Sequence, residues 1–334
     1  MDEKSYLAVV VEEESDGRFT RHVRERSLSD LAGAEVIVRV AYSSINYKDV
    51  LSATGHRGIT RQYPHTPGID AVGKVFASKS TAFSPGDQVI VTGHDLGMNT
   101  NGAWSQYIAA PATWIMPMPQ GLSAWECMAL GTAGFTAAMC VRRLEETGLS
   151  PPAGDIVVTG ATGGVGCLTI SLMNQLGYRV VALTRKSKLG AFLRKIGATE
   201  IVDRTDFMSQ VQRPLLTARW AGAVDTVGGP VLDAVLRSIK YGGAVACCGM
   251  AASPQLDTNV YPFILRDVSL LGIDSSGCEM SLRCQLWSKL ANEWKIRNLS
   301  AIATEIGFDN LDETIEDMLA GQHHGRKLVR INHD

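Results

Sequence analysis

Three glycines at positions 160, 163 and 166 have a spacing that could hold a phosphate group. A glycine carries no Cβ, so backbone N–H groups can approach a pyrophosphate closely, and the start of a helix adds a dipole that favours negative charge. The spacing is Gly-x-x-Gly-x-x-Gly, a variant of the more frequent Gly-x-Gly-x-x-Gly. Glycine clusters also mark ordinary turns, so the neighbouring residues must decide between the two interpretations.

The elements on either side of these glycines favour phosphate binding. Residues 156–158 are apolar, as in a strand that is buried on both faces of a parallel sheet. Residues 165–176 predict a helix of small and apolar side chains. We therefore expect the turn to bind a dinucleotide, with contacts from Thr162, Gly163, Gly164 and Val165.

A second predicted strand, 178–184, runs into a basic segment. In a βαβ unit this position meets the adenosine ribose, where an Asp or Glu would hold the 2′-hydroxyl of NAD. Here Thr184, Arg185 and Lys186 offer a hydroxyl and two positive charges instead, which suit the 2′-phosphate of NADPH. The alternative is a solvated basic start to the next helix.

Further apolar strands complete a doubly wound parallel sheet, which binds ligands beyond the carboxyl ends of its strands. Arg204 ends one short strand and could close over the adenine or the phosphate, although a plain surface arginine fits equally well. The backbone around Met250 follows another strand and is expected to line the nicotinamide pocket. The remaining predicted elements are a strand at 221–227, a helix at 231–240 and a strand at 243–249.

Size and composition indicate a soluble protein of two domains. The 334 residues are 45% hydrophobic and 20% charged, and the net charge of −2 gives no basic footprint for nucleic acid. Residues 1–4 are too polar to begin a signal peptide, and the weakly polar run 127–141 predicts a buried helix and not a membrane span. We expect a cytoplasmic protein with no membrane partner.

The cysteines and histidines do not suggest a metal site. The seven cysteines form no Cys-x-x-Cys pair and read as reduced thiols, and the seven histidines are scattered. Upstream of the glycine turn, residues 1–127 have short strands and frequent turn signals, which predict a compact β-barrel-like domain. Its clearest strands are 35–41, 73–76 and 88–92.

Several short motifs occur in the order found in the medium-chain dehydrogenase/reductase superfamily, and the whole chain resembles it. The combination is most similar to the acryloyl-CoA reductase subfamily of the quinone oxidoreductase branch. This resemblance implies an α/β protein with a GroES-like catalytic domain (1–127 and 265–334) and a Rossmann NADPH-binding domain (128–264). The motifs are 43–49, 67–73, 85–89, 131–137, 161–166, 262–266 and 325–329.

Two departures separate the chain from the zinc-dependent members of that superfamily. Residues 68–70 read Gly-Ile-Asp where the alcohol dehydrogenases carry Gly-His-Glu, and an isoleucine cannot bind a metal. Residues 93–103, where the structural zinc lobe would lie, contain no cysteine. We therefore expect a zinc-independent enzyme with no metal site.

Without a metal, a conjugated alkene or a quinone is an easier acceptor than a simple ketone, because charge spreads into an oxygen that hydrogen bonds can hold. The resemblance places Tyr47 over the cofactor, with a possible second role as proton donor, and Asn46 is expected to polarise the substrate carbonyl. The alternative is structural: Asn46 or Asp49 would cap a helix, and Lys48 could pair with Asp49.

The resemblance also implies roles for residues far along the chain. Ile264 and Ser275 would lie near the cofactor, with sheet packing as the alternative, and Arg326 would complete the site from the C-terminal segment, unless it is an ordinary basic residue before a strand. Arg57, in a loop, could reach a CoA phosphate or simply be solvated.

These expectations combine into one function and two alternatives. The first is NADPH-dependent reduction of a short 2-enoyl-CoA, specifically acryloyl-CoA to propanoyl-CoA, by a homodimer. The second is an NADPH:quinone oxidoreductase, which would use the same residues on a different acceptor. The third is a protein that binds NADPH with little catalysis.

Overall fold

The computed structural model describes residues 5–332, which form two compact units. The β-rich unit comprises residues 5–132, 276–291 and 303–332, and the parallel-sheet unit comprises Ala133–Ser275 and Asn292–Ile302. The expectation about a signal peptide rested on residues 1–4 and lies outside the described residues. The boundaries of these units differ from those of the implied domains, 128–264 and 265–334.

The parallel-sheet unit contains the doubly wound sheet that the sequence predicted. Its six strands are β8 (Ile156–Thr159), β9 (Val180–Thr184), β10 (Glu200–Asp203), β11 (Trp220–Asp225), β12 (Ile239–Cys247) and β13 (Ser269–Gly272). They are all parallel, in the order β10-β9-β8-β11-β12-β13. Because β13 pairs with β12, residues 269–272 belong to this sheet and not to the β-rich unit.

Helices connect these strands: α3 (Gly164–Gln175), α4 (Gly190–Lys195), α5 (Arg204–Ser209), α6 (Gly229–Leu236) and α7 (Tyr261–Arg266), with a 3-10 turn at Ser187–Leu189. The unit also contains α9 (Leu299–Ile302) and a 3-10 turn at Pro151–Ala153. Helix α3 packs on β8 and β9. One apolar cluster joins Val157 of β8, Phe207 of α5, Trp220 of β11 and Val235 of α6, so the helices bury one face of the sheet.

The β-rich unit is built on a mixed sheet of seven strands and a separate hairpin. The hairpin is β1 (Ser5–Glu13) and β2 (Phe19–Ser27), and the sheet strands are β3 (Val36–Ser44), β4 (Asp70–Ser78), β5 (Gln88–Thr92), β6 (Tyr107–Ala110), β7 (Ile115–Pro117), β14 (Ala303–Ile306) and β15 (Arg326–Arg330). The order β14-β15-β3-β4-β5-β7, with β6 also on β3, places the last strand of the chain beside β3. The sheet thus joins residues from both ends of the sequence.

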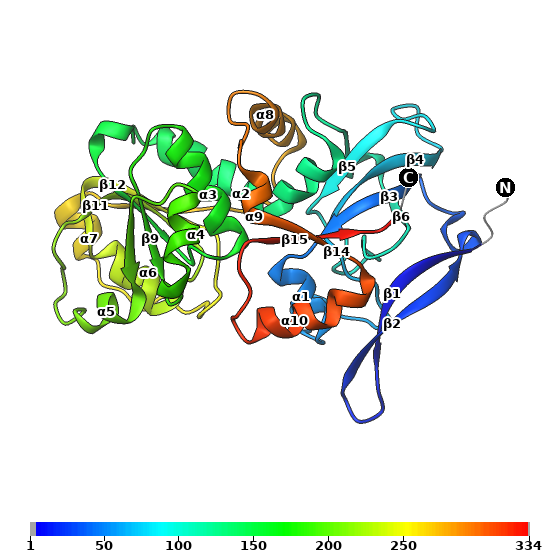
Figure 1. Cartoon of the computed structure of the whole chain (residues 1–334), viewed down its shortest axis with the longest axis horizontal. Coiled ribbons are helices and arrows are strands. Elements are labelled where there is room, and N and C mark those ends of the chain that lie inside the picture. Colours follow the sequence, from blue (N-terminus) through cyan, green and yellow to red (C-terminus); the bar gives the residue numbers. More distant parts are fainter. Residues whose placement is uncertain (1–4, 333–334) are drawn as a thin grey trace. The chain divides into compact units, whose positions relative to one another are not determined.

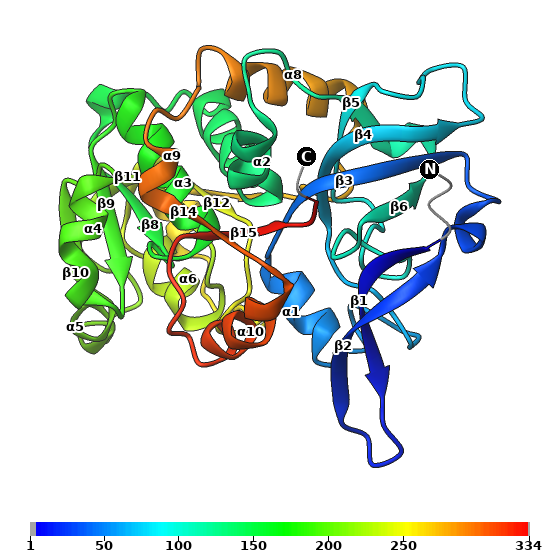
Figure 2. The ribbon, with the colours of Figure 1, turned by 45° about the vertical axis from the view of Figure 1, so that its right-hand side comes forward.

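Helices close the β-rich unit. They are α1 (Tyr47–Ala53), α8 (Met280–Ala291) and α10 (Leu311–Leu319), with 3-10 turns at Leu28–Leu31, Ala112–Trp114 and Phe308–Asn310. Helices α1 and α10 lie side by side in both views (Figures 1 and 2). Buried Val50, Leu311 and Ile315 belong to the same apolar cluster as Trp104, so core packing holds α1 in place while Tyr47 stays 46% exposed.

Helix α2 (Ala124–Glu146) passes from one unit to the other. It is long and apolar enough to cross a membrane by composition, yet 72% of its most apolar stretch is buried inside the protein, which agrees with the expected buried helix. Its dihedral angles break at Gly131, with φ 51° and ψ −155°. This break becomes important in the site described below.

Candidate functional site

The glycine turn lies between β8 and α3, as predicted. Gly163 precedes α3, and no side chain of the described residues caps that end of the helix. The twelve-residue helix therefore presents uncapped backbone at its N-terminus, which favours an anion. Thr162 is buried, whereas Gly163, Gly164 and Val165 are partly exposed.

The shape of this turn depends on Gly160. Its φ is +57°, and a Cβ there would lie 2.2 Å from Thr226 Oγ1. Thr226 in turn donates its N–H to Thr159 Oγ1 and its hydroxyl to Thr159 O, both at 3.0 Å. Thr159 donates to the buried carboxylate of Asp225 at 2.7 Å. These hydrogen bonds hold Thr226 against the turn, where only a glycine fits at position 160.

Basic side chains converge at the ends of β9 and β10. Thr184 and Asp203 are register partners, so Arg185 and Arg204 leave the sheet at the same edge. The pKa of Arg204 is lowered, first by burial and then by the positive charge of Arg185, so the two guanidinium groups lie close enough to repel each other. Thr184 Oγ1 accepts the N–H of Lys186 at 3.0 Å. An anion between the two arginines would relieve this repulsion.

The other cofactor candidates of this unit fall at opposite edges of the sheet. Met250 and Ser275 follow β12 and β13, at the carboxyl edge, and Met250 is 60% exposed. Ile264 lies in α7, whose last residue Arg266 donates to the carbonyl of Ile239 at the start of β12. Because β12 and β13 are parallel, the chain must return to the amino edge between them, and this return carries Ile264 away from Met250.

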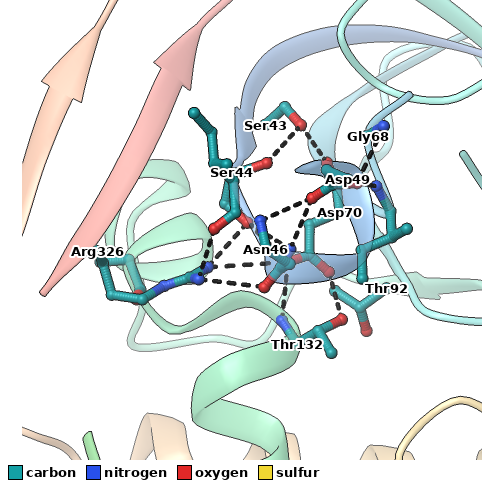
Figure 3. Close-up of polar contacts among 12 residues, drawn as sticks. Ser43, Ser44, Asn46, Asp49, Gly68, Asp70, Thr92, Thr132 and Arg326 are labelled. Atoms are coloured by element: carbon teal, nitrogen blue, oxygen red, sulfur yellow. Dashed lines mark hydrogen bonds and ion pairs between the residues drawn. The ribbon is translucent and has the colours of Figure 1, made fainter. Parts of the chain in front are cut away.

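A buried polar network occupies the β-rich unit where β3, α1, β4, α2 and β15 meet (Figure 3). Ser44, Asp49 and Asp70 are fully buried, Arg326 is 3% exposed, and Asn46 is half-buried. Asn46 precedes α1, and its N–H donates to Asp49 Oδ2 at 2.7 Å, which together form a capping box. Asn46 and Asp49 therefore make the contacts expected of residues that cap a helix.

Asp70 is the most heavily used acceptor of the network. Its Oδ2 accepts from Ser44 Oγ at 2.7 Å, from Asn46 Nδ2 at 2.8 Å and from the N–H of Thr132 at 2.9 Å. Its Oδ1 accepts from the hydroxyl of Thr132. Arg326 Nη2 completes the set as an ion pair at 3.9 Å.

Asp49 holds the segment that precedes β4. Its Oδ1 accepts the N–H groups of Gly68 at 3.1 Å and Ile69 at 2.8 Å. Burial, and then the nearby charge of Asp70, raises the pKa of Asp49 to about 7. A buried carboxyl is thus poised to change its protonation near neutral pH.

Three other candidate residues near α1 have different surroundings. Tyr47, the first residue of α1, is 46% exposed. Lys48 does not pair with Asp49, since its Nζ donates to Ser276 Oγ at 2.8 Å. Arg57 forms a two-pronged ion pair with Glu13 at 2.6 Å, so its head group is already occupied by protein.

Sequence patterns singled out Asn46, Asp49 and Arg326 of this network but not its other members. Asp70 was noted only inside a motif, and Ser44 and Thr132 were not singled out. A usable signal was Gly131, which interrupts an otherwise helical apolar run: a Cβ there would lie 2.6 Å from Asp70 Oδ2 and 2.8 Å from Arg326 Nη2. Such a glycine indicates that polar side chains approach the helix backbone.

Two family descriptions match the chain. The description "Alcohol dehydrogenase GroES-like domain" covers residues 32–120, and "Zinc-binding dehydrogenase" covers residues 164–292. The residues do not fit the zinc of the second description. Ile69 is buried with its N–H on Asp49, and among residues 5–332 no three His, Cys, Asp or Glu side chains are grouped so as to hold a metal ion.

Known proteins of similar length resemble the chain closely. It is 41% identical to the acrylyl-CoA reductase AcuI of Ruegeria pomeroyi over 97% of this chain and 98% of that protein. The crystal structure of Escherichia coli K-12 YhdH with bound NADPH has a TM-score of 0.93 and 40% identity, covering 97% of this chain and 100% of that one. The Bacillus subtilis YhfP structure with NAD bound has a TM-score of 0.94 and 42% identity, covering 98% and 99%.

Proposed function

Because the chain belongs to the medium-chain dehydrogenase/reductase superfamily, in the zinc-independent branch of the acrylyl-CoA reductases, we propose that it reduces the conjugated C=C of a short 2-enoyl-CoA with NADPH. The specific substrate is acryloyl-CoA and the product is propanoyl-CoA. The 41% identity with AcuI supports this substrate over other acyl chains.

The paired arginines Arg185 and Arg204 are the observation that carries the cofactor assignment. YhdH was crystallised with NADPH and YhfP with NAD, so likeness alone leaves the cofactor open. Two mutually repelling guanidinium groups at the ribose end of the βαβ unit suit a 2′-phosphate, which NADPH has and NADH lacks. When bound, NADPH supplies the hydride that reduces the β-carbon.

The remaining cofactor contacts are assigned by their place in the fold. The turn residues would hold the pyrophosphate on the uncapped start of α3, and Met250 with Ser275 would border the nicotinamide at the carboxyl edge of the sheet. Ile264 is left out of this set because α7 takes it to the amino edge. The turn residues are Thr162, Gly163, Gly164 and Val165.

Tyr47 is the residue we assign to the reacting end. Its exposed ring can stack on the nicotinamide or contact its ribose, and its hydroxyl can donate a proton at the α-carbon. Tyr47→Phe keeps the ring and removes the hydroxyl, whereas Tyr47→Ala removes both. If the hydroxyl donates the proton, Tyr47→Phe lowers kcat roughly 100-fold or more, as for removal of a general acid, and leaves the KM for NADPH unchanged.

Loss of NADPH absorbance, followed by stopped flow with acryloyl-CoA and with benzoquinone, tests the proposal. We expect a higher kcat/KM with acryloyl-CoA. Faster turnover of the quinone would instead favour an NADPH:quinone oxidoreductase, an alternative supported by YhfP, whose name contains the term quinone oxidoreductase and which is 43% identical over 93% of this chain.

We also propose a cytoplasmic homodimer that pairs through β13. This strand ends the sheet order, and an unpaired edge can add a strand from a second copy. Leu270 on the edge and Ile264 and Leu265 on α7 are exposed apolar side chains beside it. Light scattering should give a dimer for the wild type and a monomer for Leu270→Lys; a monomeric wild type would refute the dimer.

A further inference from the structure

The amide of Asn46 has no hydrogen left for a substrate. Its Nδ2 carries two hydrogens and lies 2.8 Å from Asp70 Oδ2, 3.3 Å from Asp49 Oδ2 and 3.3 Å from Ser44 Oγ. Its Oδ1 accepts from Arg326 Nη1 at 3.1 Å. Polarising a substrate carbonyl would require Asn46 to give up a bond to a buried carboxylate.

The guanidinium of Arg326 is committed in the same way. Its donors reach Ser44 Oγ at 2.8 Å, the carbonyl of Ile45 at 3.0 Å, Asn46 Oδ1 at 3.1 Å and the carbonyl of Ala129 at 3.3 Å. An arginine has five N–H donors, so these four bonds leave at most one, and Asp70 lies 3.9 Å away on the same side. A side chain that is 3% exposed and used in this way is poorly placed to bind a cofactor.

All of these contacts converge on the point where β3 becomes α1. Arg326 comes from β15, Asp70 from β4, and Ser44 and Asn46 flank Ile45 at the end of β3 (Figure 3). The next residue is Tyr47, the first of α1. A helix of seven residues is too short to fix its own first turn, so its start must be set by tertiary contacts.

We propose that Arg326 and Asn46 are positioning residues that act through the first turn of α1 to place Tyr47, and that neither binds substrate or cofactor. Arg326 supplies the permanent charge that lets Asp70 remain buried as an acceptor, and Asn46 transmits that anchor to Asp49 and the helix. The expected kinetic effect rests on the proposed function, whereas the expected effect on α1 does not.

Arg326→Lys tests this inference because it keeps the charge and removes the planar fork of donors. Arg330→Lys is the matched control: Arg330 lies on the same strand and pairs with exposed Glu305. Ser44→Ala is a milder second variant, which removes one acceptor of Arg326 and one donor to Asp70. Three quantities are measured: the Kd of NADPH by fluorescence, kcat with acryloyl-CoA, and amide hydrogen exchange of residues 47–53.

For Arg326→Lys we expect a kcat at least tenfold lower, amide exchange in α1 at least tenfold faster, and an NADPH Kd that rises no more than it does in Tyr47→Ala; Ser44→Ala should change kcat and the exchange rate in the same direction. Arg330→Lys should change none of them. A tenfold rise in NADPH Kd with unchanged exchange in α1 would make Arg326 a cofactor contact and overturn the inference. If the wild type reduces no enoyl thioester, the proposed function fails, and exchange in α1 still decides the positioning role.

Discussion

The two polar regions of this protein use their charges in opposite ways. At the carboxyl edge of the parallel sheet, Arg185 and Arg204 bring like charges together, and no side chain within residues 5–332 caps the start of α3 at that edge. In the β-rich unit, Asp70 and Arg326 oppose each other inside a network in which donors and acceptors are matched. An anion would relieve the repulsion in the first arrangement, whereas the second already pairs its charges within the protein. This contrast separates binding residues from residues that hold the fold.

Asp70→Asn should have the largest effect, because it breaks the buried polar network of the β-rich unit. The substitution keeps the shape but removes the buried negative charge opposite Arg326, and breaking a buried pair costs about 3–5 kcal/mol. Urea unfolding measures the change. Asp312→Asn is the control, since Asp312 is 58% exposed in its pair with Arg21 and should lose less than about 1 kcal/mol. Equal losses in the two variants would contradict the contrast.

Gly131→Ala attacks the same network from the helix backbone. The residue has φ 51° and ψ −155°, a conformation nearly confined to glycine, and the added Cβ would lie 2.6 Å from Asp70 Oδ2. Backbone strain and overpacking together should reduce the free energy of unfolding by about 2–4 kcal/mol. Gly33→Ala, where a Cβ meets nothing within 4 Å, should change it by less than about 1 kcal/mol.

Local patterns were sufficient to predict most of the fold. The strand expected at 88–92 is β5 (Gln88–Thr92), and the helix expected at 165–176 is α3 (Gly164–Gln175). Apolar runs bounded by glycine carry this information within a few residues. The placement of 265–274 was harder, because a four-residue strand such as β13 has too short a pattern to show which sheet it joins.

The two candidate sites also differ in how far local sequence patterns could predict them. The anion site could be predicted because its parts follow one another along a βαβ unit, so that Gly160 and Arg185 are linked by a known geometry. The buried network joins Ser44 to Arg326 across 282 positions and Asp70 to Thr132 across 62. No local spacing connects such residues, and each one, taken alone, resembles an ordinary polar residue.

Arg185→Ala should have a smaller effect, confined to cofactor binding at the paired arginines. Loss of one cation from the paired arginines should raise the Kd of NADPH tenfold or more, about 1.4 kcal/mol, and change that of NADH less than twofold. The free energy of unfolding should stay constant, because Arg185 is exposed. Arg194→Ala, an exposed arginine of α4, is the control for binding. Equal weakening of both cofactors would refute the 2′-phosphate assignment.

The last effect is a gradual change with pH and concerns the proton of Asp49. Its pKa, raised from 3.8 to about 7 by burial and by Asp70, is higher in the folded chain than in the unfolded one. Its contribution to stability is therefore complete below about pH 3.8 and is lost as the pH rises through about 7. The free energy of unfolding should fall between pH 5 and 7 by less than about 1.4 kcal/mol per pH unit.

Asp49→Asn isolates this proton from the others. The amide oxygen can still accept from Gly68 and Ile69, but its NH₂ group would face the N–H of Asn46, so the variant is less stable at every pH. The slope is thus the informative quantity: it should be shallower in Asp49→Asn than in the wild type and unchanged in exposed Asp309→Asn. Identical slopes in the wild type and both variants would show that another group binds this proton. The buried network would then differ from the anion site in its contacts but not in its response to pH.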